Sequence, residues 1–399
     1  MSQPVRQAIA EAHPETLIKP FYTLLVDGSA MLRLSMVDTK TNEQGIHYGG
    51  IFQMLLQIKM LMQKADYSYA YVFFDNEDSG ILRYNIYKDY KSNRDKKYQE
   101  HTALSEYAKK YNENLRNMQK YIFEKKKKNS PKKEVDTEKL DKQKIVDENF
   151  MRERDILCKY FNELYIRWVA DEVTEGDDLI AYYVQNKKPE EKIVIATLDE
   201  DLTQLISDTV CIYNLREKKY ISNKNFQSLR GFPYQNVVLK KILLGDTSDN
   251  ISNIKGLSES RLFELMPEIK ERPVTLEEVK QRAKEYCDAR IEEKKKPLQW
   301  QENIVNGVPN KEYDGDFYEI NRKLIDLSHP ILSKDAKEEM DGMMYNAQDP
   351  EGRSLENLYR YIMEDNITEL KADNGFSRFF ETFKPLMDKE QKRYKEMYS

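Results

Sequence analysis

Short apolar runs that end in an acidic residue recur along the first half of the chain. Residues 21–31 read FYTLLVDGSAM, which predicts a buried strand ending at Asp27, and residues 69–75 read YAYVFFD, which predicts a second strand ending at Asp75. Between them, residues 49–65 place apolar side chains at helical spacing. Further strands are expected at 192–201 and 210–215, followed by a hairpin at 216–224. Strands that alternate with helices predict an α/β fold, in which helices cover both faces of a parallel sheet.

Two other stretches depart from this pattern. Residues 95 to about 150 are rich in lysine and glutamate and lack the apolar stripe of a core helix, so we expect a partly helical insertion that projects from the sheet. From about residue 226 the strand signals fade and helical patterns continue to the end of the sequence. The expected organisation is a flexible N-terminus at 1–20, an α/β domain at 21–225 that carries the insertion, and a mostly helical domain at 226–399.

Composition excludes several classes of protein. No apolar run approaches the roughly 20 residues of a membrane span, and residues 1–20 lack the apolar core of a secretory signal, so we expect a cytoplasmic protein without membrane contact. The cysteines, Cys158, Cys211 and Cys287, are odd in number and far apart, which indicates neither a disulfide framework nor a cysteine zinc site. The net charge of −5 argues against a nucleic-acid partner, but residues 119–133 hold seven lysines and one glutamate. The average charge therefore hides a basic segment.

Carboxylates that follow the expected strands are the strongest chemical signal. The candidate residues are Asp27, Asp75, Glu175, Asp177, Asp178, Asp199, Asp201, Asp246 and Asp249. Glu175 and Asp178 are three apart and share one helix face, and Asp246 and Asp249 repeat that spacing. Taken singly, each group has an ordinary alternative as a turn residue, a helix cap or a solvated helix end. Taken together, they are expected to converge, because ligands of parallel sheets bind at the carboxyl ends of the strands.

Converging carboxylates need cations. Two carboxylates about 4 Å apart repel by about 4 kcal/mol at an effective dielectric constant of about 20. An all-oxygen ligand set without histidine selects hard divalent ions such as Mg²⁺ or Mn²⁺ over zinc. A pair of such ions suits hydrolysis of a phosphodiester, whose transition state gathers negative charge. Lys91 and Arg94 lie three apart and would face one phosphate if their segment is helical, which makes them the candidate catalytic cations.

These segments, taken in order over residues 24 to about 265, resemble the 5′-nuclease, or flap endonuclease, superfamily, which has a PIN-like fold. The segments are VDGS, FFD followed by YKSNR, EGDDLIA, TLDEDLTQL and GDTSDNISNIKGL. Within the superfamily, FDNEDSGILRYNIYKDYKSNR and YEINRKLIDLSHPIL look most like the ribonuclease H of T-even bacteriophages. The resemblance implies a phage-encoded enzyme that acts in DNA replication.

The resemblance also implies site residues. Two Mg²⁺ ions, with Mn²⁺ as a substitute, would be held by two carboxylate sets whose boundary is open: Asp27, Asp75, Glu175, Asp177 and Asp199 in one, and Asp178, Asp201, Asp246 and Asp249 in the other. Lys91 and Arg94 match the basic pair at the base of a helical arch. The insertion would be that arch, with Lys125, Lys126, Lys127 and Lys128 guiding a single strand.

A helix-hairpin-helix variant at about 238–266 is the second implied DNA contact. Lys255, Gly256, Ser258 and Arg261 would hold duplex phosphates there, often beside a potassium ion. The sequence departs from the family pattern G-[IV]-G-x-K, because Ser258 replaces the second glycine and Ser260 replaces the lysine. Arg261 is then the expected phosphate contact, and the K⁺ site is in doubt.

The expected function is that of a metal-dependent, structure-specific 5′-nuclease that removes RNA primers and 5′ flaps. Expected partners are DNA with a 5′ flap or single-stranded 5′ end and RNA–DNA hybrids, together with a single-stranded-DNA-binding protein and a sliding clamp, and the protein is expected to be a monomer. Two alternatives stay open, a PIN-type endoribonuclease and a non-catalytic binder of branched DNA. A haloacid-type phosphatase is disfavoured, because VDGSA lacks a D-x-D nucleophile pair.

Overall fold

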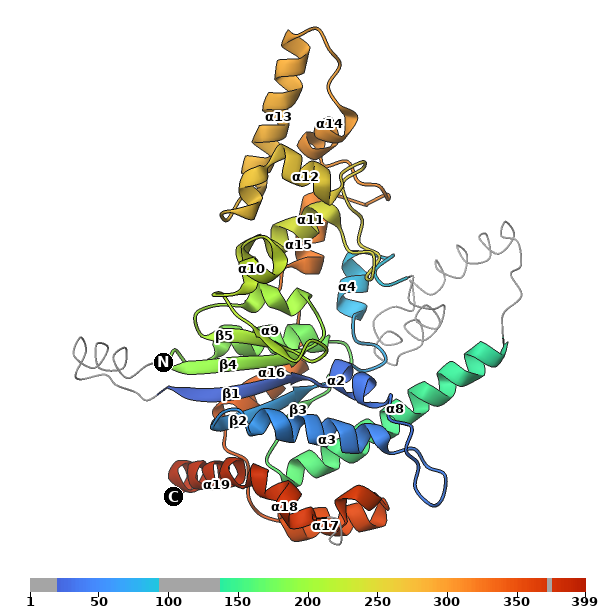
Figure 1. The fold of residues 1–399 in the computed structure, drawn as a ribbon, viewed down its shortest axis with the longest axis vertical. Coiled ribbons are helices and arrows are strands. Elements are labelled where there is room, and N and C mark those ends of the chain that lie inside the picture. The colour runs from blue at the N-terminus through green and yellow to red at the C-terminus, as the bar shows by residue number, and fades with distance from the viewer. Residues whose placement is uncertain (1–19, 93–136, 372–374) are drawn as a thin grey trace, which may run out of the picture.

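The structure, a computed structural model, describes residues 20–92, 137–371 and 375–399 (Figure 1). Four parts of the expected organisation fall partly or wholly outside these residues. They are the N-terminus, most of the insertion, Arg94, and the lysines Lys125 to Lys128. The expectations for them stay predictions.

A six-stranded sheet with the order β3-β2-β1-β4-β5-β6 forms the centre of the molecule. The strands are β1 (Phe21–Asp27), β2 (Tyr67–Phe73), β3 (Arg167–Val169), β4 (Glu191–Thr197), β5 (Val210–Asn214) and β6 (Lys219–Ile221). All neighbours pair in parallel except β5 and β6, which form the expected hairpin as an antiparallel edge. The predicted parallel-sheet α/β fold is confirmed. Strand β3 was not predicted, because three residues are too few for a periodic signal.

Both faces of the sheet are buried. Along β1, Leu24 and Val26 belong to one hydrophobic cluster and Leu25 to another, as the two-residue period of a strand requires. One face is covered by α2 (Gly28–Ser35), α3 (Gly49–Met62), α8 (Thr137–Glu163), α17 (Leu355–Glu364), α18 (Phe376–Phe380) and α19 (Lys384–Tyr398). The other face is covered by α9 (Gly176–Asn186), α10 (Phe226–Arg230) and α16 (Lys334–Tyr345).

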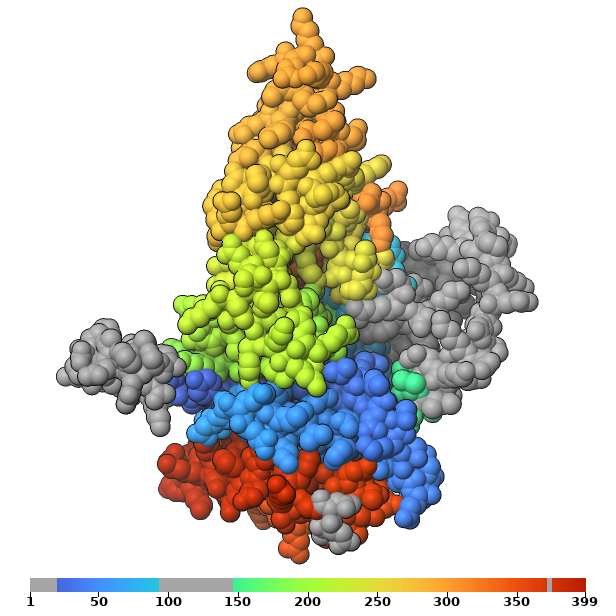
Figure 2. Space-filling model, viewed as in Figure 1, coloured from blue at the N-terminus to red at the C-terminus, as the bar shows by residue number. Residues whose placement is uncertain are grey.

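A third hydrophobic cluster lies beyond one end of the sheet (Figures 1 and 2). It is formed by α11 (Val237–Leu244), α12 (Glu259–Leu265), α13 (Leu276–Glu292), α14 (Gln299–Asn306) and α15 (Phe317–Ile325). Tyr87 and Tyr90, which follow α4 (Ile81–Ile86), also pack into it. The 3₁₀ helices are η1 (Asp201–Leu205), η2 (Tyr234–Asn236), η3 (Pro267–Lys270), η4 (Thr368–Leu370) and η6 (Glu381–Phe383).

The region after residue 226 is mostly helical, as expected, but it packs in two places. Helices α11 to α15 form the third cluster, whereas α16 to α19 return to cover the sheet. In Figure 1, α17 to α19 lie at the end of the molecule opposite to the third cluster, and α16 lies at the level of the sheet. Residues from both sides of position 226 thus share two of the hydrophobic clusters, and the domain boundary expected there stays a prediction. Of the helices that the structure describes, none combines the length and the apolarity that crossing a membrane would require.

Candidate active site

Three of the candidate acids follow adjacent strands. Asp27 is the last residue of β1, and Asp75 and Asp199 each come two residues after the end of β2 and β4. Strand β1 pairs in parallel with β2 on one side and with β4 on the other. Because the carboxyl ends of parallel strands meet at one edge of a sheet, the structure brings these three side chains together there.

Hydrogen bonds fix the direction of two of these carboxylates. Asp27 caps α2, since its Oδ1 accepts from the N–H of Ala30 at 2.9 Å, and its Oδ2 accepts from the hydroxyl of Thr197 at 2.8 Å. Oδ1 of Asp75 accepts from the N–H of Gly176, at the start of α9, at 2.8 Å. Asp75 and Asp27 are thus held by residues of the neighbouring elements, which leaves their remaining lone pairs for other ligands.

The close approach of β1 and β2 depends on Gly28. A Cβ atom at this position would lie 2.6 Å from Cγ1 of Val72 and 2.8 Å from the carbonyl oxygen of Phe73. Both distances are shorter than any ordinary contact of a side chain. The glycine in VDGS therefore lets α2 start directly against β2, which places Asp27 beside the end of that strand.

A fourth acid joins this group from α9. Burial and the neighbouring carboxylates of Asp199 and Asp27 raise the pKa of Asp177 well above its usual range. Burial and Asp75 likewise raise the pKa of Asp27 to about 7. Among the described residues, no lysine, arginine or histidine forms an ion pair with Asp27, Asp75, Asp177 or Asp199. We call these four residues the acidic cluster; within the part of the chain that the structure describes, no cation pairs with it.

The other two acids of EGDD face an arginine instead. Arg83 of α4 donates from Nη1 to Glu175 at 2.5 Å and to Asp178, and from Nη2 to Asp178 at 3.0 Å. All three side chains are buried, and the Asp178 carboxylate also accepts from the N–H of Ile331 at 2.9 Å. Glu175 and Asp178 therefore share a helix face, as their spacing predicts, and that face is turned toward Arg83.

Lys91 contacts the other oxygen of Glu175, so this carboxylate lies between two cations. Burial alone would raise the pKa of Glu175, but Lys91 and Arg83 outweigh burial and lower it to about 2.

The turn that carries Lys91 also contacts Asp249. Tyr90 donates to Glu175 at 3.0 Å and to Asp249 at 3.2 Å, and the N–H of Lys91 donates to the Asp249 carbonyl at 2.8 Å. Lys91 has a φ of +52°, so its segment is a turn; the helix considered for Lys91 and Arg94 is absent up to residue 92.

The remaining two acids share Lys241 of α11. Its Nζ donates to Asp246 at 2.6 Å and also contacts Asp201. Burial and Asp199 raise the pKa of Asp201 to about 7. Hydrogen bonds from Lys241 and Ser248 overcome burial and lower the pKa of Asp246 to about 2. Lys241 thus partly neutralises Asp201 and Asp246, in contrast to the acidic cluster, which has no ion-pair partner among the described residues.

Whether the acids fit a divalent cation can be judged from these contacts. In the described ranges, no three or more His, Cys, Asp or Glu side chains are placed to hold a metal ion together. The acidic cluster nevertheless has the chemistry that such an ion needs, since it offers only carboxylate oxygens and the neighbouring carboxylates help to raise the pKa of Asp27 and of Asp177. Asp178, Asp201 and Asp246 already have cationic partners. The division into two ligand sets stays a prediction, and the acidic cluster is its best supported part.

Residues 22–231 match the family described as 5′-3′ exonuclease, N-terminal resolvase-like domain. The chain belongs to this family. The matched range includes the acidic cluster, Arg83 and Lys91, and it ends before Asp246 and Asp249. The resemblance to 5′-nucleases is therefore confirmed.

Curated relatives match over a shorter stretch. The 5′-3′ exonuclease of Mycoplasma genitalium is 39% identical over 99 residues, which are 23% of this chain and 34% of that protein. The 5′-3′ exonuclease of Bacillus subtilis is 31% identical over 98 residues, or 24% of this chain and 33% of that protein. The matched stretch thus spans about a third of the length of these relatives.

Solved structures of bacteriophage T5 proteins share the fold over nearly the whole chain. The T5 D15 flap endonuclease, in a complex with DNA and metal ions, has a TM-score of 0.51 at 14% identity and covers 93% of this chain and 99% of its own. The T5 5′-exonuclease with bound zinc gives 0.52 at 14% identity, with 92% and 99% covered. At this identity the likeness concerns the fold, which agrees with the expected PIN-like core.

In this exonuclease-family chain, α11 and α12 flank the segment for which the helix-hairpin-helix variant is expected, and that assignment stays a prediction. Ser258 caps α12, because its hydroxyl accepts from the N–H of Arg261 at 3.3 Å and lies 2.9 Å from that of Ser260. Lys255, Gly256 and Arg261 are exposed on the same turn. The two serines that depart from the family pattern thus form the start of the helix, and the side chains of Lys255 and Arg261 remain exposed beside it.

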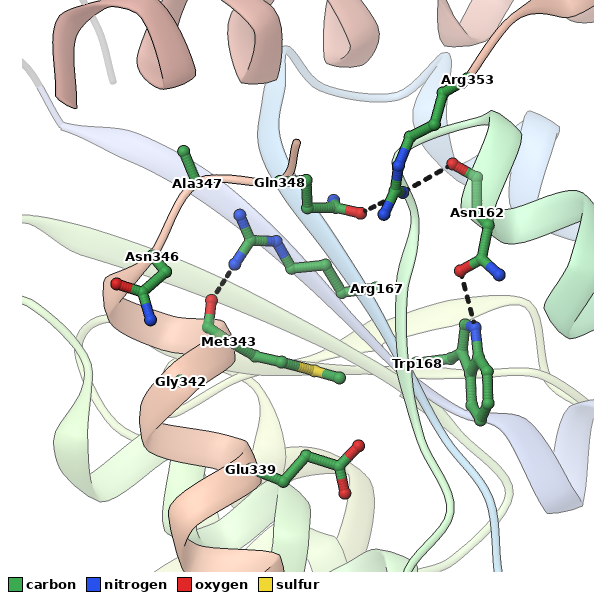
Figure 3. Close-up of a pocket in the computed structure, with 10 residues that line it drawn as sticks. All are labelled: Asn162, Arg167, Trp168, Glu339, Gly342, Met343, Asn346, Ala347, Gln348 and Arg353. Atoms are coloured by element: carbon green, nitrogen blue, oxygen red, sulfur yellow. Dashed lines mark hydrogen bonds between the residues drawn. The ribbon is translucent and has the colours of Figure 1, made fainter. Parts of the chain in front are cut away.

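A pocket of about 350 Å³ lies away from these residues, between β3, α16 and the segment after α16 (Figure 3). Arg167 of β3 reaches the carbonyl of Met343 there, and Arg353 donates to Gln348 and to the carbonyl of Asn162. None of the nine candidate acids lines this pocket. The candidate acids therefore lie at the carboxyl ends of the strands, away from this cavity.

Sequence reasoning missed the partners of the acids. Arg83, Tyr90, Lys241 and Thr197 hold Glu175, Asp249, Asp246 and Asp27 in place. Tyr90 and Lys241 carried a weak signal. Tyr90 directly precedes Lys91, and Lys241 lies five residues before Asp246, and both Lys91 and Asp246 were candidate site residues. Arg83 carried a stronger signal, because it is a cation inside the short apolar helix ILRYNI.

Proposed function

We propose that this protein is a metal-dependent, structure-specific 5′-nuclease that hydrolyses phosphodiester bonds at 5′ ends or flaps and removes RNA primers and 5′ flaps during DNA replication. The observation that carries the proposal is the acidic cluster at the ends of three adjacent strands. Its substrates would be DNA with a 5′ flap or a single-stranded 5′ end and RNA–DNA hybrids. Action as a monomer with a single-stranded-DNA-binding protein and a sliding clamp rests on the family resemblance alone.

The acidic cluster and the nearby acids would hold two divalent cations, Mg²⁺ or in its place Mn²⁺. Such ions lower the pKa of an attacking water and stabilise the leaving oxygen of a phosphodiester. Asp27 and Asp75 are directed by hydrogen bonds from the protein, so they need little reorganisation to ligate a cation. Lys91 contacts the carboxylate of Glu175 near the acidic cluster, and its ammonium group would supply positive charge to the transition state.

A substrate panel tests the proposal. Labelled 5′-flap, nicked and RNA-primer–DNA substrates are incubated with and without Mg²⁺, and the products are mapped. The proposal requires Mg²⁺-dependent cuts near the junction or stepwise products from the 5′ end. Preferred cleavage of competing single-stranded RNA would favour a PIN-type endoribonuclease, and binding of branched DNA without any cleavage would favour a non-catalytic binder.

Replacing Lys91 by alanine should lower the single-turnover rate on a 5′-flap substrate by about 10²-fold, the usual loss for one preorganised transition-state donor. Lys88→Ala is the matched control, because Lys88 lies on the same turn but is exposed and contacts only Asn85 and the ring of Tyr84 among the described residues. Rapid-quench kinetics measure both variants. An unchanged rate for Lys91→Ala would remove Lys91 from the catalytic residues.

The metal-free protein should lose stability as the pH rises. The folded pKa values of Asp27 and Asp201, each about 7, exceed the ordinary value of 3.8, so the folded state keeps protons that the unfolded state releases between about pH 4 and pH 7. The free energy of unfolding therefore falls across that window. Added Mg²⁺ should raise the melting temperature more at about pH 8 than at about pH 5, because only ionised carboxylates bind it. Thermal scans at both pH values check this, and an equal Mg²⁺ effect at both would contradict it.

A further inference from the structure

The last part of the segment between α11 and α12, residues 254–258, has hydrogen-bonded carbonyls throughout. From Ile254 to Ser258, each backbone carbonyl accepts a hydrogen bond from the protein. The donors are, in order, the Leu257 N–H at 3.0 Å, Asn303 Nδ2 at 2.8 Å, Arg261 Nη1, Asn253 Nδ2 at 3.1 Å and the Leu262 N–H at 2.9 Å. A monovalent cation bound by this turn would need several of these oxygens as ligands.

Arg261 is the donor that carries charge. Its side chain folds back from the first turn of α12, so that Nη1 donates to the Gly256 carbonyl. The guanidinium lies over the ring of Trp300, 5.8 Å from its centre, and Trp300 is itself buried on α14. Gly256 has a φ of +77°, and a Cβ there would lie 3.8 Å from this same Nη1. The guanidinium of Arg261 is thus held on the turn both by the Gly256 carbonyl and by the ring of Trp300.

A potassium ion does not fit beside this arginine. Two unit positive charges about 4 Å apart repel by about 4 kcal/mol at an effective dielectric constant of about 20. The guanidinium also uses the Gly256 oxygen that would face such an ion. The residues present therefore disagree with the K⁺ site that the family resemblance suggests.

We propose that Arg261 is the built-in cation of this turn and joins the Gly256 carbonyl to a phosphate of duplex DNA without K⁺. Arginine has five N–H donors, of which one is used on the turn, and the side chain is exposed. The backbone N–H groups of Gly256 and Ser258 donate to no acceptor among the described residues, so they are available as further donors to a phosphate bound at this turn. The part of the proposal that concerns DNA rests on the proposed function; the part that concerns the turn does not.

The first experiment needs no DNA. Hydrogen exchange of the full-length protein is followed by mass spectrometry for peptides over residues 254–262, in potassium chloride and in tetramethylammonium chloride at equal ionic strength. Exchange should be the same in both salts for the wild type and faster in both for Arg261→Ala. Slower exchange of the wild-type turn in potassium alone would overturn the proposal, and so would an Arg261→Ala turn as protected as the wild-type turn.

The second experiment measures duplex binding by fluorescence anisotropy in the same two salts. Wild-type affinity should agree within about twofold between them, and Arg261→Ala should weaken binding several-fold and lower the slope of log Kd against log salt by about one. Arg360→Ala, an exposed arginine of α17 at the opposite end of the molecule, controls for the lost charge. Tighter wild-type binding in potassium would overturn the proposal. Failure to bind duplex in any salt would count against the proposed function, while the exchange experiment would still decide the state of the turn.

Discussion

Asp27→Asn and Asp199→Asn should each lower the single-turnover rate of Mg²⁺-dependent flap cleavage by about 10³-fold or more, because polarisation by a bound divalent cation contributes several kcal/mol to the transition state. Duplex binding should persist, since neither residue lies on the α11–α12 turn. Asp208→Asn is the control, an exposed aspartate that contacts Asn223 and lies outside the acidic cluster. Rapid-quench assays with saturating enzyme give the rates, and anisotropy gives the affinities.

Asp27→Asn should also make the metal-free protein more stable. The raised pKa of Asp27, about 7, means that its ionised form is disfavoured in the folded state by burial and by Asp75. Removing that charge should increase the free energy of unfolding at about pH 8 by about 1–2 kcal/mol, a value reduced from the full shift because solvent screens a side chain that is only partly buried. Denaturant titration measures it. Rapid cleavage by both variants, or a destabilised Asp27→Asn, would contradict the role given to the acidic cluster.

The positions of the acids at the strand ends could be predicted from the sequence, because they depend on local rules. An apolar run that ends in aspartate predicts a strand end, and neighbouring parallel strands bring their ends together. Gly28 follows the same logic, since only glycine fits where α2 starts against β2. For Asp27, Asp75 and Asp199, the position along the chain was thus enough to predict the position in space.

The partners of the other acids depend on long-range packing, which the sequence does not display. The three-residue spacing of Glu175 and Asp178 places them on one helix face, but nothing in it says that Arg83, about 90 residues earlier, would meet that face. The path of α16 to α19 back onto the sheet is another example, because their apolar stripes fit a separate domain equally well. Lys91 shows a third limit, since it combines a left-handed backbone conformation with a hydrogen bond from its N–H to the distant Asp249 carbonyl, and neither can be predicted from its own segment.

This packing gives Arg83 a structural importance that the sequence did not indicate. Its guanidinium contacts two buried carboxylates and donates from Nε to the Leu324 carbonyl at 3.0 Å, so it links α4, α9 and α15. It therefore joins the sheet that carries the acidic cluster to the helices that carry the α11–α12 turn. Arg83 therefore helps to fix the position of the acidic cluster relative to the α11–α12 turn.

Arg83→Met should lower the free energy of unfolding by about 3–5 kcal/mol, because it leaves Glu175 and Asp178 buried without their shared cation. Arg230→Met is the matched control. Arg230 also contacts two carboxylates, Glu200 and Glu217, but these are half-exposed, so its loss should cost no more than about 1 kcal/mol.

Adding Glu175→Gln and Asp178→Asn to Arg83→Met should recover much of the lost stability, because the added changes remove the unpaired charges, while cleavage stays low. Urea denaturation of the three proteins and the wild type gives the comparison. Equal losses for Arg83→Met and Arg230→Met would show that burial does not set the strength of the Arg83 contacts. A triple variant no more stable than Arg83→Met would show that the link to α15, and not the charge of the two acids, is what Arg83 provides.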